Sequence, residues 1–114
     1  LIIRSRVTEA MGAMNAEEQA TAMSTHYACG LEGIEETARW IWNNRFAAVA
    51  SDNVAVEAMP PIGIGEEEPF TELALHQWCL SMFGLPLGEL WYLKELAEQS
   101  LADRRWTILL TLVR

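Results

Sequence analysis

Basic residues are scarce in this chain. Only 8 lysines and arginines stand against 16 aspartates and glutamates in 114 residues, which gives a formal net charge of −8 at pH 7. A protein with this charge repels phosphate backbones and anionic lipid headgroups. We therefore expect neither nucleic acid nor a membrane surface as a partner.

Cysteines and long apolar runs are also few. Cys29 and Cys79 are the only cysteines, and their spacing matches neither a metal site nor a disulfide framework. This usage indicates a reducing compartment, the cytosol, without structural disulfides. The most hydrophobic run, Trp106 to Val113, contains two threonines and is much shorter than the roughly 20 residues of a membrane helix. No membrane span is expected.

The residues that are present suffice for one small domain, because 51% of them are hydrophobic. Each end of the chain lies in a run that is typical of a strand, Leu1 to Val7 and Trp106 to Val113. Domains rarely begin and end within strands, so we expect a piece of a longer protein whose sheet continues on both sides. Open sheet edges pair readily with other chains, which predicts a homo-oligomer.

The order of the predicted elements indicates an α/β fold with at least partly parallel strands. Between the two terminal strands the pattern first predicts a helix after Asn15, a helix through Ile34 to Phe46 and a buried strand over 46–50. It then predicts a helix from about Thr71 to Gly84, a short extended segment over 85–90 and a helix over 93–101.

Local signals fix several of these boundaries. Asn15 lies three positions before Glu18, as in a capping box that starts a helix through about Met23. Gly84 suits the left-handed turn that closes a helix, and Pro86 cannot continue one. In the helix predicted from Ile34 to Phe46, one stripe is expected to be buried: Ile34, Ala38, Ile41, Trp42 and Phe46.

The stretch from Phe70 to Leu90 contains the residues best suited to carry chemistry. Helical spacing places His76 on an apolar face together with Leu73, Leu80 and Phe83, and Glu89 follows in the extended segment. An imidazole and a carboxylate that meet in space can bind a divalent metal. From the residues alone, a core histidine with satisfied hydrogen bonds and an exposed glutamate at a strand edge remain alternatives.

Other candidates carry weaker signals. Asp52 follows a buried strand, where open α/β sheets bind ligands, but it could equally be a turn residue that bonds nearby backbone. His26 and Cys29 are three positions apart without further ligands, so solvated loop residues are the favoured interpretation. Tryptophans 40, 42, 78, 91 and 106 could line an aromatic pocket, with Trp78 the foremost candidate, although core packing explains most of them.

Five segments, in order along the chain, resemble one known family. These are Ile2–Ser5, Gly30–Trp42, Phe46–Asp52, Leu75–Trp78 and Gly84–Leu90, and they are similar to the cyclase family that includes the kynurenine formamidases, most of all to its fungal, uncharacterised branch. The resemblance covers nearly the whole chain but only the later half of a family domain. Residues 1–114 are thus expected to form a single partial domain.

The resemblance implies a fold and a function. Family members form a β/β/α sandwich and hydrolyse C–N bonds in small amides such as N-formylkynurenine, with one or two divalent metals, often zinc. Matched residue by residue, His76 and Glu89 correspond to the family's late metal ligands, and Asp52 to a position with a structural role. No catalytic residue is implied in this chain.

Two parts of the family pattern are missing from this chain. The main metal motif, His-x-Gly-Thr-His-x-Asp-x-Pro-x-His, precedes the matching region, and the family's C-terminal tail follows it. The expected function is therefore a fragment of a metal-dependent hydrolase acting on a small molecule. The alternative is a catalytically inert α/β fragment that acts as an association module.

Overall fold

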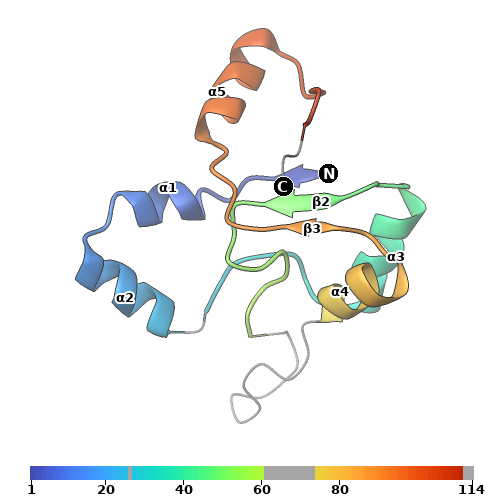
Figure 1. Ribbon diagram of the computed structural model, residues 1–114, viewed down its shortest axis with the longest axis horizontal. Coiled ribbons are helices and arrows are strands. Elements are labelled where there is room, and N and C mark those ends of the chain that lie inside the picture. Colours follow the sequence, from blue (N-terminus) through green and yellow to red (C-terminus); the bar gives the residue numbers. More distant parts are fainter. Residues whose placement is uncertain (26, 61–73, 112–114) are drawn as a thin grey trace.

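A small parallel sheet lies at the centre of the protein (Figure 1). The structure, a computed structural model, describes residues 1–25, 27–60 and 74–111. Strands β1 (Ile2–Ile3), β2 (Val49–Ser51) and β3 (Leu87–Gly88) are hydrogen-bonded in that order, and both pairings are parallel. With its helices, the described part is a mixed structure compatible with the predicted α/β class.

Helices extend from the sheet in three directions. In the view of Figure 1, α1 (Val7–Gly12) and α2 (Ala16–Ser24) lie on one side, while α3 (Glu35–Asn43) and α4 (Ala74–His76) lie on the other. A π-helical segment, η1 (Gln77–Met82), continues α4 directly. The last helix, α5 (Lys94–Asp103), follows β3 and stands above the sheet in this view.

The predicted helix boundaries at Asn15 and Gly84 are confirmed. The Asn15 side chain accepts hydrogen bonds from the backbone N–H groups of Glu17 and Glu18, and the Glu18 carboxylate accepts one from the Asn15 N–H, which completes the capping box. Gly84 has a φ of 61°, in the left-handed region that glycine adopts without strain. Local sequence chemistry therefore decides where these helices begin and end.

The core joins α3, β2 and the helical segment around Leu75. The strand predicted over 46–50 begins later than expected: β2 is Val49–Ser51 and all three of its residues are buried, whereas Phe46 to Ala48 lie outside the strand and Ala47 is exposed. The side chains of one buried cluster come from these elements and from the segments beside them: Ala38, Ile41, Val49, Val56, Leu75, Cys79 and Leu85. This packing fixes α4 and η1 against the strand that lies in the middle of the sheet.

Two predicted strands at the ends of the chain are wrong or shorter than expected. At the N-terminus only Ile2 and Ile3 form a strand, because Arg6 turns the chain with a φ of 74° and α1 begins at Val7. Near the C-terminus no strand is present over the described residues 106–111, and the rest of that predicted strand lies outside the described residues. Residues 4–7 and the described residues 106–111 lack the continuous pairing that a strand requires.

Some predictions of burial are also wrong. Trp42 is 57% exposed, because α3 turns Ala38 and Ile41 to the core and leaves Trp42 at the rim, where its ring lies 4.8 Å from that of Phe83. Leu80 is 49% exposed. A π-helix has more residues per turn than an α-helix, so the assumed 3.6-residue period shifts out of phase in η1.

Candidate functional site

Two chain segments meet where β2 and β3 end. Because these strands are parallel, their carboxyl ends lie at the same edge of the sheet, which is where open α/β sheets bind ligands. After β2 the chain runs from Asp52 to Met59, and after β3 it reaches Glu89. The Val56 N–H donates a hydrogen bond to Oε1 of Glu89 at 2.9 Å, so the two segments lie side by side.

His76 lies between two carboxylates at this edge. Its Nε2 atom is 3.2 Å from Oε1 of Glu89, and its Nδ1 atom is 3.2 Å from Oε1 of Glu57. The side chain of Glu57 is 1% exposed, whereas those of His76 and Glu89 are 22% and 29% exposed. The structure thus brings together the two predicted site residues and adds Glu57 as a third.

Glu57 was not among the candidates from the sequence, since it lies between the predicted strand over 46–50 and the helix predicted from about Thr71. In the structure it belongs to an extended segment, because Leu31 forms a parallel bridge with Glu57 and Ala28 an antiparallel bridge with Met59. Leu31 donates its N–H to Val56, and Ala58 donates to Leu31, at 2.9 and 2.8 Å. The available sequence signal was a carboxylate directly after the apolar residues Val54 to Val56.

The carboxylate of Glu57 is poorly satisfied. Within the described part of the chain, neither of its oxygens nor the Nδ1 atom of His76 has a hydrogen-bond partner, although Oε1 and Nδ1 lie 3.2 Å apart. Burial is the main cause that raises the pKa of Glu57, and the nearby Glu89 charge raises it further, while His76 acts in the opposite direction. A buried carboxylate in this state favours a proton donor or a cation beside it.

The donor set suits a divalent cation on one side of His76. Two ligands about 2.1 Å from one zinc ion at a tetrahedral angle lie roughly 3.4 Å apart, and the 3.2 Å between Nε2 of His76 and Oε1 of Glu89 is close to this value. Glu57 faces the opposite ring nitrogen and does not converge on the same point. Accordingly, residues 1–25, 27–60 and 74–111 contain no group of three or more candidate ligands arranged to hold a metal.

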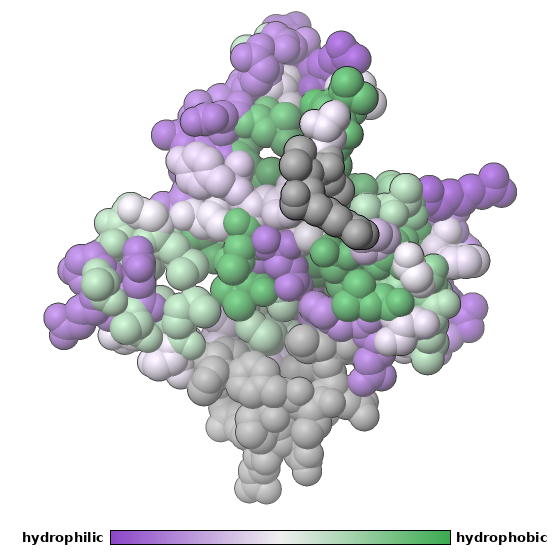
Figure 2. Space-filling model, in the orientation of Figure 1, coloured by the Kyte–Doolittle hydropathy of each residue, from purple (hydrophilic) through white to green (hydrophobic). Residues whose placement is uncertain are grey.

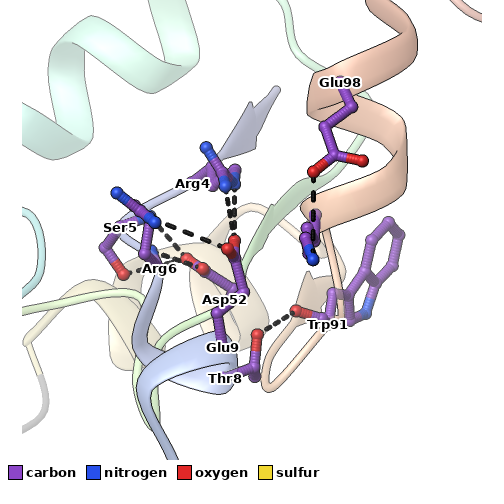
Figure 3. Close-up of polar contacts among 9 residues, drawn as sticks. Arg4, Ser5, Arg6, Thr8, Glu9, Asp52, Trp91 and Glu98 are labelled. Carbon is purple, nitrogen blue, oxygen red and sulfur yellow. Dashed lines mark hydrogen bonds and ion pairs between the residues drawn. The ribbon is translucent and has the colours of Figure 1, made fainter. Parts of the chain in front are cut away.

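Asp52 makes its hydrogen bonds with the turn after β1, whereas the contacts of His76 are with Glu57 and Glu89. Its carboxylate accepts hydrogen bonds from the Ser5 N–H at 2.6 Å, the Ser5 hydroxyl at 2.8 Å and the Arg6 N–H at 2.6 Å (Figure 3). Burial is the largest single influence on the pKa of Asp52 and raises it, but the hydrogen bonds from Ser5 and Arg6 together outweigh it and lower that pKa. Asp52 therefore holds the turn that follows β1.

The remaining sequence candidates do not join the cluster. His26 lies outside the described residues, and Cys29 is exposed with its Sγ atom 3.4 Å from Oδ1 of Asn53. Trp78 packs against the core and lines a cavity of about 490 Å³ together with Trp42 and other residues of α3 and η1, a set that does not include His76. Three of the five tryptophans, Trp40, Trp42 and Trp106, are 49%, 57% and 73% exposed, so the expectation that core packing explains most of them is wrong.

Comparisons of this chain with protein-family models, with curated proteins and with solved structures found no match. Among the described residues, no helix is long and apolar enough to cross a membrane.

Proposed function

We propose that this chain is the later half of a metal-dependent hydrolase domain of the cyclase type, and that His76 and Glu89 are two of its metal ligands. The observation that carries this proposal is the position of His76 between two carboxylates at the carboxyl ends of adjacent parallel strands. The proposed substrate is a small amide such as an aryl formamide, the proposed metal is zinc, and the full domain would be a β/β/α sandwich in the cytosol.

In this proposal the chain's own residues hold and orient the site. A bound divalent cation would polarise the substrate carbonyl and make a water molecule more acidic. His76 presents Nε2 toward the same space as the Glu89 carboxylate, and the Val56 N–H keeps that carboxylate in place. Asp52 fixes the turn after β1 at the same edge of the sheet. The further ligands would come from the family's His-rich motif.

The second candidate, an inert association module, is favoured by the apolar surface beside α5. Figure 2 shows apolar side chains gathered there, next to the C-terminal segment. Trp106 is 73% exposed and Leu109 is 92% exposed, and a cavity of about 530 Å³ lies among Leu1, Leu93, Leu96, Trp106 and Ile108. Contiguous exposed apolar surface of this kind is typical of an interaction site.

Hydrolysis by a longer protein tests the enzyme proposal. We expect a chain extended to include a His-rich metal motif to hydrolyse N-formylkynurenine or another aryl formamide with added zinc or manganese, whereas the 114-residue chain does not. In the extended protein, His76→Ala and Glu89→Gln should each reduce kcat/KM at least about 10-fold, since losing a ligand loosens the metal. Full activity of the His76→Ala variant would refute the proposed site.

Zinc titration of the 114-residue chain provides a second test. Stable zinc sites use three or four protein ligands, so His76 and Glu89 alone should bind zinc only weakly. Binding is measured by nitrogen-15 NMR of the His76 ring during addition of zinc. Tight one-to-one binding that is lost in His76→Ala would contradict the expectation that most ligands lie elsewhere.

A further inference from the structure

The two carboxylates beside His76 differ in environment. Glu89 is 29% exposed to solvent and already accepts a hydrogen bond from the Val56 N–H. Glu57 is 1% exposed, and neither of its oxygens has a hydrogen-bond partner among the described residues. A buried carboxylate without a donor is costly. Of the two, Glu57 therefore gains more from the single proton of a neutral imidazole.

The position of the single ring proton decides which ring nitrogen of His76 can bind a cation. A neutral histidine has one N–H donor and one free lone pair, and its hydrogen bond on one side fixes the tautomer on the other. A proton on Nδ1, beside Glu57, leaves the lone pair on Nε2, beside Glu89. The lone pair and the Glu89 oxygen are then 3.2 Å apart and both able to coordinate.

We propose that Glu57 is a positioning residue that accepts the Nδ1 proton of His76 and so keeps Nε2 directed, with Glu89, at a bound divalent cation. This inference deepens the proposed function and rests on it. A carboxylate behind a metal-binding histidine fixes its ring orientation and raises its basicity, and loss of such a partner typically weakens metal binding about 10- to 100-fold. Nδ1 and Oε1 are within hydrogen-bond distance at 3.2 Å, but neither atom has a hydrogen-bond partner among the described residues in the present geometry, so the two side chains must reorient slightly for the bond to form.

The burial of Glu57 is difficult to explain by stability alone. A carboxylate that is 1% exposed and has no hydrogen-bond partner among the described residues destabilises the fold, whereas Asp52, which holds a turn, accepts hydrogen bonds from Ser5 and Arg6. Sites kept for function often cost stability in this way. Replacement of Glu57 by a neutral residue of the same shape should therefore weaken zinc binding without weakening the fold.

The test compares Glu57→Gln, Glu89→Gln and the matched control Glu36→Gln, which makes the same change at an exposed carboxylate of α3. Zinc affinity of the 114-residue chain is measured by NMR titration, thermal stability by circular dichroism, and the His76 tautomer by nitrogen-15 chemical shifts at a pH where the ring is neutral. Glu57→Leu, which removes the acceptor entirely, is the second variant at this position.

For the wild type we expect a proton on Nδ1. In Glu57→Gln we expect an increased share of the other tautomer, zinc affinity reduced about 10- to 100-fold, and an unfolding temperature equal to or above that of the wild type. Glu57→Leu should show a larger tautomer change, and Glu36→Gln should match the wild type in all three measurements.

Three results would overturn the proposal. The first is a wild-type proton on Nε2, and the second is an unchanged tautomer and zinc affinity in Glu57→Gln. The third is a complete loss of zinc binding in Glu57→Gln with the tautomer unchanged, because Glu57 would then be a direct ligand. If the wild type binds no zinc at all, the proposed function fails at that point. The tautomer comparison, made without metal, then decides by itself whether Glu57 positions His76.

Discussion

Gly30 lies so close to the backbone of Glu57 that no other residue fits at this position. A Cβ atom added at Gly30 would come 2.2 Å from the carbonyl carbon and 2.4 Å from the carbonyl oxygen of Glu57. Backbone atoms cannot move aside as a flexible side chain can. The segment that carries Glu57 is therefore held in register against residues 28–31 by the absence of a side chain at Gly30.

The Gly30→Ala variant should be less stable and should displace Glu57. We expect a loss of about 1–3 kcal/mol, the usual cost of overpacking, measured by urea unfolding. Gly12→Ala is the matched control, because a Cβ at Gly12 meets nothing within 4 Å and Gly12 ends α1 without a positive φ. That control should be neutral or more stable by up to about 1 kcal/mol. Equal stability of the two variants would contradict this account.

The Asp52→Asn variant should be less stable than the wild type, and its free energy of unfolding should depend less on pH in the acidic range. An Asn amide nitrogen would face the Arg6 N–H, so two donors would oppose each other, at a cost of about 2 kcal/mol. The folded state lowers the pKa of Asp52 from its usual 3.8. Its contribution is therefore complete above pH 3.8 and is lost as the pH falls through the folded-state value.

The measurement for Asp52 is the free energy of unfolding from pH 7 downward. Wild type should lose this contribution on acidification below the usual aspartate pKa, and Asp52→Asn should not. Asp103→Asn, at the exposed end of α5, is the control and should follow the wild-type curve. A parallel acid dependence in wild type and Asp52→Asn would show that Ser5 and Arg6 do not stabilise the carboxylate.

The chain should self-associate through the apolar C-terminal segment. Leu109 is 92% exposed and Trp106 is 73% exposed, so burying them against a second copy would remove apolar surface from water. The double variant Trp106→Ser, Leu109→Ser should shift sedimentation toward the monomer. Met82→Ser, at a residue of η1 that is 68% exposed, is the control and should leave association unchanged. A wild-type monomer over a wide concentration range would refute the prediction.

The two cysteines should react at very different rates. Cys29 is exposed, while Cys79 is fully buried, and burial together with the nearby Glu57 charge raises the pKa of the Cys79 thiol. In native protein, iodoacetamide should modify Cys29 quickly and Cys79 only on unfolding, as followed by mass spectrometry. Cys29→Ser should remove the fast phase. Rapid modification of Cys79 in that variant would contradict the packing of η1.

The sequence by itself determined the features that depend on neighbouring residues. The capping box at Asn15, the left-handed turn at Gly84 and the burial of Val49 and Ala50 in β2 follow from hydrogen bonds, backbone freedom and apolar character within a few positions. The 3.9 Å ion pair between Lys94 and Glu98 follows in the same way from their four-residue spacing in α5. These local rules also brought His76 and Glu89 forward as candidates.

Only the tertiary structure decided how the site is assembled. Glu57 meets His76 because parallel pairing places the ends of β2 and β3 together, and because Gly30 admits the backbone of Glu57 beside it. The π-helical geometry of η1 changed which side chains are buried, which a 3.6-residue period could not indicate. Contacts between residues distant in sequence depend on the packing of the whole chain, so no local pattern encodes them.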